Sequence, residues 1–346
     1  MDSIFPKRIA DVAQLEELLS RPTPGAVETM KRLKGDVVIL GVGGKIGPSL
    51  ARMVRRADAA AGVSRRVFGV ARFSSPGLKE KLEADGIEAI PCDLLDRERL
   101  AALPDAPNVL YLAAMKFGAT GREAATWARN VYLPGLVCEK YRRARVVAYS
   151  TGNVYPLVPV SGGGSVESDA PNPVGEYGMS CLGRERIFQY FSRLFDMPVA
   201  FIRLNYANEM RYGVIVDLAR KVFAGEPVDA TMGYFNAIWQ GDNNAMTLQA
   251  FDHAAAPPRA INVTGRRVLS VREIARQLGE LMGRPAAVVG QEAPDALLSD
   301  STLARRLFGE PRVEESQLIE WIADWTVRGG PTLDKPTRFE VRDGRF

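Results

Sequence analysis

Histidine and cysteine are scarce in this chain, and their scarcity excludes several kinds of chemistry. The 346 residues include one histidine, His253, and three cysteines. One histidine excludes most histidine-based metal sites, so we expect His253 to be structural and no metal to be bound. Three cysteines are too few for a disulfide scaffold and favour a reducing compartment. Any proton transfer must therefore proceed without histidine or with His253 alone.

Charge imbalance and long apolar runs are also missing. Lys and Arg number 45 against 41 Asp and Glu, a net charge of +4, which is too even to indicate nucleic acid or an anionic membrane as the main partner. No apolar run reaches the ~20 residues that span a bilayer, and residues 1–6 are too polar and short for a signal peptide. We therefore expect a cytoplasmic protein that acts on a small molecule.

What the sequence does have is a regular alternation of strand and helix patterns. Apolar, β-branched runs alternate with helical segments from residue 36 onward, which predicts an α/β fold with a doubly wound parallel sheet, the Rossmann arrangement. The strands are expected at 36–41, 66–72, 88–93, 108–114, 144–150 and 198–204, and the helices at 47–56, 77–85, 97–103, 126–141 and 178–195.

This alternation divides the chain into three predicted parts. Residues 1–35 form a helical extension, interpreted as a cap on the main domain, with a subunit contact as the alternative. Residues 36–204 form a dinucleotide-binding Rossmann domain. Residues 205–346 form a smaller C-terminal α/β substrate lobe, part of which returns to the Rossmann core.

A glycine-rich loop follows the first predicted strand and opens the first helix. The glycines of such a loop permit a tight turn, close backbone approach to a pyrophosphate and close helix packing, while the helix N-terminus attracts the anion. The second strand ends without the acidic residue that would bind the ribose of NAD, and Arg72 and Ser74 stand there instead. This favours NADP, with NAD as the alternative. The loop residues are Gly41, Gly43, Gly44, Lys45, Ile46 and Gly47.

Further motifs occur in an order that resembles the extended short-chain dehydrogenase/reductase family, which includes nucleotide-sugar epimerases and dehydratases. The resemblance runs from about residue 36 to about residue 325. It implies an adenine contact at Asp93 and Leu94, and a cofactor-lining segment that includes Ala113, Ala114 and Lys116. It also implies a family asparagine at Asn130, a catalytic hydroxyl at Thr151 and an active-site tyrosine, Tyr177, that also contacts the cofactor.

The active-site motif departs from the family pattern at one position. The family has Tyr-x-x-x-Lys, whereas this chain has Tyr177-Gly-Met-Ser-Cys181. A neutral cysteine cannot supply the positive charge that favours an ionised phenol, and a thiolate would oppose it. Cys181 fits a small buried apolar residue, and the nearest basic residue is Arg184.

Three interpretations of the catalytic positions Thr151, Tyr177 and Cys181 stay open. In the first, another group supplies the positive charge near Tyr177, such as the cationic oxidised nicotinamide or Lys116. In the second, Tyr177 is a weaker acid–base group. In the third, the chain binds the cofactor without redox chemistry. The last would make it a regulatory or scaffold protein. An active chain would transfer hydride at a carbinol of a sugar, sugar acid or nucleotide sugar, with Tyr177 as acid or base and Thr151 orienting the oxygen.

The resemblance also implies a class of reaction, a homodimer and a set of substrate contacts. Dehydratases of the family carry an Asp-Glu pair after the threonine; Gly152 and Asn153 stand here, which favours epimerisation or oxidoreduction. A homodimer is expected through residues 122–142 and 178–196, as in family members. The substrate contacts are expected from Lys116, Asn153, Asn205, Tyr206, Trp239 and Gln240.

Overall fold

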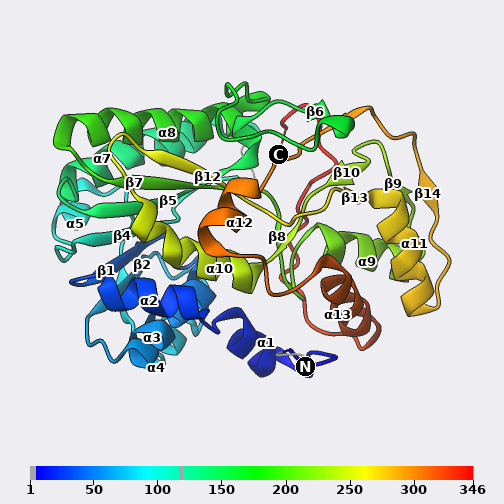
Figure 1. Cartoon of the computed structure of the whole chain (residues 1–346), viewed down its shortest axis with the longest axis horizontal. Coiled ribbons are helices and arrows are strands. Elements are labelled where there is room, and N and C mark those ends of the chain that lie inside the picture. Colours follow the sequence, from blue (N-terminus) through cyan, green and yellow to red (C-terminus); the bar gives the residue numbers. More distant parts are fainter. Residues whose placement is uncertain (1–4, 117–119, 346) are drawn as a thin grey trace.

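A computed structural model describes residues 5–116 and 120–345. The chain forms a large lobe built on a parallel sheet and a smaller, mostly helical lobe beside it, with the N-terminal helices below both in Figure 1. Within the described residues, no helix is both long and apolar enough to cross a membrane.

Seven parallel strands form the main sheet, in the order β12-β7-β5-β4-β1-β2-β3. The α/β doubly wound prediction is therefore confirmed. The direction of winding reverses between β1 and β4, where sheets of this class leave a crevice at the carboxyl ends of the strands. The strands are β1 (Val37–Leu40), β2 (Val67–Ala71), β3 (Glu88–Pro91), β4 (Asn108–Tyr111), β5 (Arg145–Thr151), β7 (Val199–Leu204) and β12 (Arg259–Val263).

Helices cover both faces of the sheet, because successive residues of its buried strands point to opposite faces. Val37 and Ile39 of β1 pack in one core with Met53 of α3, whereas Val38 and Leu40 pack in another with Phe188 of α8. The first face carries α3 (Gly47–Ala61), α4 (Leu78–Ala84) and α10 (Gln240–Gln249); the second carries α5 (Arg97–Ala101), α7 (Leu133–Lys140) and α8 (Gly175–Phe195).

The N-terminal extension packs as a cap on this scaffold. Its helices are α1 (Val12–Leu19) and α2 (Pro24–Arg32), and the side chains of Asp11 and Thr23 cap their first turns. Leu15 of α1 is buried in the core of the smaller lobe, and Met30 of α2 is buried against the sheet. The extension therefore ties the two lobes together.

The smaller lobe is built around three helices that share one core: α9 (Val214–Ala224), α11 (Val271–Met282) and α13 (Glu315–Val327). Four short strand pairs border it: β6 (Val158–Pro159) with β15 (Asp295–Ala296), β8 (Ala207–Asn208) with β11 (Ile238–Trp239), β9 (Val228–Asp229) with β14 (Val288–Val289), and β10 (Tyr234–Phe235) with β13 (Leu269–Ser270). The helix α12 (Thr302–Phe308) lies against β12. Three-residue or four-residue 3-10 turns stand at Gly152–Val154, Val160–Gly162 and Ala250–His253.

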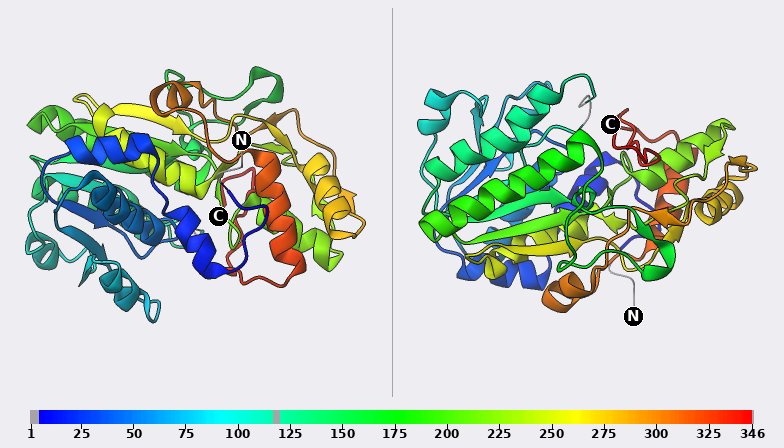
Figure 2. Two further views of the ribbon diagram at one scale, coloured as in Figure 1. Left: turned by 60° about the horizontal axis from the view of Figure 1, so that its bottom comes forward. Right: turned by 90° about the horizontal axis from the view of Figure 1, so that it is seen from above.

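After α13 the chain continues without regular structure and returns to the large lobe. Phe339 in this C-terminal segment (residues 331–345) is buried in the core of the smaller lobe, with its ring centroid 6.0 Å from that of Phe235. The backbone of Gly344 then packs against that of Val174 and Gly175 at the start of α8. The segment therefore ends where the two lobes meet, as the right view of Figure 2 shows.

Candidate functional site

The glycine loop between β1 and α3 is a tight turn in which two glycines have no room for a Cβ. Gly41 has a φ of +90°, and a Cβ there would lie 2.7 Å from the backbone nitrogen of Ala113. A Cβ on Gly47 would lie 2.2 Å from the carbonyl oxygen of Val42. Gly43 and Gly44 are exposed, and no side chain caps the first turn of α3 after Ile46. The free N–H groups of that turn suit the diphosphate of a dinucleotide.

The side chains predicted for the adenosine half lie at the adjoining strand ends. Arg72 and Ser74 follow β2 and are exposed, and Asp93 follows β3, where its carboxylate accepts a hydrogen bond from the Leu95 N–H. Leu94 is buried. Because β2 pairs with both β1 and β3, these residues lie at the same edge as the glycine loop.

Asn130 connects the segment after β4 to α8. The predicted helix 126–141 is in fact α6 (Glu123–Trp127), a π-helical turn (Ala128–Tyr132) and α7, and such turns occur frequently at functional sites. Asn130 Oδ1 accepts from the Met115 N–H at 2.8 Å, while its Nδ2 donates to the Met115 carbonyl at 2.9 Å and to Ser180 Oγ at 3.0 Å. Asn130 therefore holds the backbone beside Lys116 and is occupied by protein groups.

Thr151, Tyr177 and Cys181 come together at the end of β5 and the start of α8. Hydrogen bonds join the Tyr177 hydroxyl to Thr151 and to Cys181, and Thr151 Oγ1 also accepts from Asn153 Nδ2 at 3.0 Å. Burial raises the pKa of Tyr177 well above its ordinary value; the neighbouring thiol raises it further, while Arg184 opposes the shift. Tyr177 is therefore a phenol at neutral pH in this structure.

The guanidinium of Arg184 is buried beside the fully buried thiol of Cys181. Arg184 is 3% exposed, and its Nη2 lies 3.7 Å from Cys181 Sγ while its Nη1 donates to the Tyr149 carbonyl at 2.9 Å. Burial raises the pKa of Cys181, and Arg184 acts against that shift. The sequence predicted no role for Arg184 at the site. Positions 177, 181 and 184 nevertheless share one helix face.

Two lysines approach the site from other elements. The Lys45 Nζ lies 3.2 Å from the ring centroid of Tyr212, and burial lowers the pKa of Lys45 to about 7, helped by the charge of Lys116. The Lys116 Nζ lies 5.8 Å from the ring centroid of Tyr177 and 6.0 Å from that of Tyr206. Burial lowers the pKa of Lys116 to about 8, opposed by Cys181 and Asp217.

A buried polar network holds the end of β5, which carries Thr151. Glu185 receives bonds from Ser150 Oγ at 2.5 Å and from both Nε and Nη2 of Arg203 at 3.0 and 2.7 Å. Arg203 Nη1 also donates to the Tyr155 hydroxyl, which in turn donates to Asn262 Oδ1. These bonds join β5, α8, β7 and β12, so the backbone that carries Thr151 is held from several sides.

Three of the predicted substrate residues adjoin the site. Asn153 is half-buried beside Thr151. Asn205 is buried, and its Nδ2 donates to the Leu297 carbonyl at 3.2 Å. Tyr206 has a φ of +52°, a backbone conformation that is uncommon for residues other than glycine and that occurs at functional sites.

Of the other three, Lys116 faces the Tyr177 ring, whereas Trp239 and Gln240 lie in the core. Trp239 is 0% exposed, and its ring centroid lies 5.5 Å from that of Trp321. Gln240 is 1% exposed, and its Nε2 donates to Ser49 Oγ at 3.1 Å. The expectation that they contact substrate is therefore corrected, because packing against α13 and α3 uses both side chains.

The C-terminal segment covers the site, which no sequence motif indicated. The Thr337 carbonyl accepts from Lys116 Nζ at 3.4 Å, and Val341 packs against the cluster that contains Tyr177 and Cys181. Asp217 of α9 anchors the segment by accepting from the Thr337 N–H at 2.7 Å and its hydroxyl at 2.6 Å. Residues far apart in the sequence thus enclose Tyr177.

Comparison with protein families gives one match over most of the sheet. Residues 37–228 match the model of the NAD dependent epimerase/dehydratase family, which is more than half of the chain. None of the curated proteins matches the chain.

Solved structures share the fold at low sequence identity. A mutant UDP-glucuronic acid 4-epimerase of Bacillus cereus, in complex with a fluorinated UDP-glucuronic acid and NAD, has a TM-score of 0.71 at 19% identity over 85% of this chain and 99% of its own. The UDP-glucose 4-epimerase of Thermotoga maritima with UDP-glucose has a TM-score of 0.69 at 18% identity, over 85% and 99%. The dTDP-glucose 4,6-dehydratase DesIV of Streptomyces venezuelae, with NAD bound, has a TM-score of 0.72 at 18% identity, over 85% and 97%.

Proposed function

The chain belongs to the NAD-dependent epimerase/dehydratase family, and from this premise we propose that it catalyses hydride transfer at a carbinol carbon of a nucleotide sugar or related sugar. The observation that carries the proposal is the hydrogen-bonded pair of Tyr177 and Thr151 at the carboxyl edge of the sheet. The pair shares that edge with the glycine loop, the expected place for a dinucleotide in a doubly wound fold.

The residues of the chain have separate tasks in this proposal. A bound nicotinamide supplies the hydride chemistry. Tyr177 exchanges the proton of the substrate hydroxyl, and Thr151 donates a hydrogen bond to the same oxygen and fixes its direction. Asn153, Asn205 and Tyr206 border the sugar, and Lys116 lies where it can contact both sugar and cofactor. The missing Asp-Glu pair at Gly152 and Asn153 favours epimerisation or oxidoreduction over dehydration.

For the cofactor, we propose NADP, although two of the three solved structures named above contain NAD. The end of β2 offers the cationic Arg72 and the hydroxyl of Ser74, which suit a 2′-phosphate. Further contacts in this proposal come from the glycine loop (Gly41, Gly43, Gly44, Lys45, Ile46, Gly47), from Asp93, Leu94, Ala113, Ala114 and Tyr177, with Asn130 acting through the backbone of Met115.

The test is a screen of the purified protein with NAD and NADP against UDP-glucose, UDP-glucuronic acid and the two free sugars, read by nicotinamide absorbance and by NMR for epimers. Tyr177→Phe should lower kcat by about 10²-fold or more at saturating cofactor, since general acid–base catalysis contributes about 10²–10⁴-fold. Tyr190→Phe, an exposed tyrosine on the same helix, is the matched control. Equal rates in Tyr177→Phe and wild type would reject the role of Tyr177.

A cofactor-binding protein without redox activity is the second candidate, and Cys181 in the lysine position favours it. It predicts tight cofactor binding through the glycine loop but no turnover with any sugar. Cofactor binding that changes the affinity for another macromolecule, in both wild type and Tyr177→Phe, would support this candidate against the enzyme.

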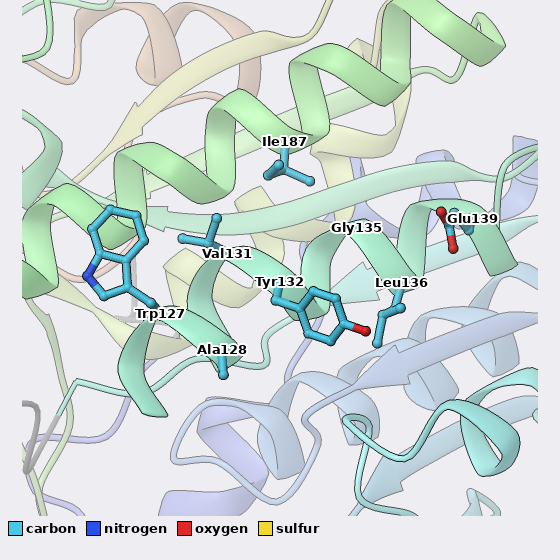
Figure 3. Close-up of a pocket in the computed structure, with 8 residues that line it drawn as sticks. All are labelled: Trp127, Ala128, Val131, Tyr132, Gly135, Leu136, Glu139 and Ile187. Carbon is cyan, nitrogen blue, oxygen red and sulfur yellow. The ribbon is translucent and has the colours of Figure 1, made fainter. Parts of the chain in front are cut away.

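We also propose that the chain forms a homodimer through the two helical segments predicted for it. Figure 3 shows an apolar groove between them, lined by Trp127, Ala128, Val131, Tyr132, Gly135, Leu136, Glu139 and Ile187. Tyr132, Tyr190 and Leu194 are 51%, 61% and 55% exposed near this groove, which is unusual for large apolar side chains without a partner. Light scattering should give twice the chain mass, and Tyr132→Glu should give the monomer mass.

A further inference from the structure

The structure places a buried positive charge next to the position where the family lysine is missing. Arg184 is 3% exposed, and arginine keeps its charge at any pH at which a protein is folded. Among the described residues, no carboxylate lies within ion-pair distance of its guanidinium, and its Nε has no hydrogen-bond partner. Burying an unpaired charge is costly, so this arginine calls for an explanation.

The carboxylate next to Arg184 in the chain is held by other groups. Glu185, the next residue on α8, is bound by Arg203 and Ser150. The guanidinium instead donates to the Tyr149 carbonyl and approaches Cys181 Sγ, which is hydrogen-bonded to the Tyr177 hydroxyl. The groups run in one line along α8 from the cation through the thiol to the phenol.

We infer that Arg184 is a positioning residue that replaces the family lysine electrostatically, acting on Tyr177 through the thiol of Cys181. This inference rests on the proposed role of Tyr177 as acid or base. Arg184 follows the position of the family lysine by three residues, about one helical turn, and its Nη2 lies 3.7 Å from the thiol that stands there. The arrangement favours a developing phenolate without placing a second titratable amine beside the phenol.

Other titratable or charged groups face this corner from the elements packed around it. Tyr111 of β4 is fully buried and lies near Arg184, and Lys116 follows β4 and faces Tyr177. Glu185 is ion-paired with Arg203, and its charge also acts on Arg184 and Cys181. Lys116 has a pKa lowered to about 8 by burial, so its charge is lost in alkaline solution. The charge of Arg184 persists over the range in which a phenol is deprotonated, as does that of Arg203, which is paired with Glu185.

The test compares Arg184→Gln, Arg184→Lys and the double variant Arg184→Gln with Cys181→Lys, using Arg186→Gln on the exposed face of α8 as control. The first readout is ¹³C NMR of labelled tyrosine with NADP bound, titrated from neutral to strongly alkaline pH. The Tyr177 resonance is the one that Tyr177→Phe removes. The second is the pH profile of kcat/KM on the sugar that the screen identifies.

Arg184→Gln should move the Tyr177 titration upward by at least one pH unit and lower kcat/KM at neutral pH about tenfold or more, because one pKa unit corresponds to a factor of ten. Arg184→Lys and the double variant should recover both quantities, whereas a purely structural role would leave the titration unmoved in any folded variant. An unchanged titration in Arg184→Gln, or a wild-type Tyr177 that never titrates, would overturn the inference. A failure of the proposed function would give a different result, which is full activity in Tyr177→Phe.

Discussion

Lys45 allows a prediction whose magnitude follows from its surroundings. Burial lowers its pKa from 10.5 to about 7, so between these pH values the unfolded chain holds a proton that the folded chain does not. The free energy of unfolding therefore rises with pH across this window, and the stabilisation is lost as pH falls through 7. Below pH 7 the full cost is about 5 kcal/mol, at about 1.4 kcal/mol per pKa unit.

Replacing Lys45 with methionine removes this cost while keeping a side chain of similar length. Lys45→Met should be more stable than wild type by about 5 kcal/mol at pH 6 and by about 2 kcal/mol at pH 9, where part of the cost has already disappeared. The difference between the two pH values, about 3 kcal/mol, is the quantity to test.

The assay is urea unfolding at both pH values, followed by circular dichroism, with Lys81→Met as the control because Lys81 is exposed on α4. The control should change stability by less than about 0.5 kcal/mol at either pH. A Lys45→Met variant that is less stable than wild type at pH 6, or whose gain is the same at pH 6 and pH 9, would refute the reasoning. The gain should come with weaker cofactor binding, since functional sites commonly sacrifice stability.

Three other changes have defined outcomes. Phe339→Ala should release the C-terminal segment and speed hydrogen exchange of residues 334–345 by about 10²–10⁴-fold, because truncating a buried Phe costs about 3–5 kcal/mol. Unchanged exchange would mean that Phe339 does not hold the segment. Glu185→Ala should lower the free energy of unfolding by about 3–5 kcal/mol, since it strands the buried Arg203 charge, and a loss under 1 kcal/mol would contradict this. Arg72→Ala should weaken NADP about tenfold, as expected from one charge-assisted contact, and leave NAD unchanged in calorimetry; equal effects on both would remove Arg72 from the 2′-phosphate site.

Much of the fold was predictable because its signals are local. The buried run Val37–Leu40 and the glycines after it predict a strand, a tight turn and a helix from neighbouring residues alone. Gly41 is an example of a residue that the turn requires, because a Cβ there would collide with the Ala113 backbone. The prediction was less accurate at ends, as where β4 stops at Tyr111, because pairing with a neighbouring strand decides where a strand ends.

The site was only partly predictable, because contacts between distant residues decide which side chains reach it. Trp239 and Gln240 have the chemistry of sugar-binding residues, yet burial places them in the core. A motif also could not indicate that residues 337–341 cover Tyr177, since Asp217 and Phe235, which hold that segment, belong to other elements.

The sequence by itself determined the strand and helix order, the glycine loop and the absence of a lysine at position 181, since each depends on residues close together in the chain. Only the tertiary structure decided how that absence is compensated. The sequence places an arginine at position 184. The packing of α8 on β4 and β5 buries its side chain without a carboxylate partner and brings the guanidinium against Cys181. An electrostatic effect depends on distance and burial, and folding sets both.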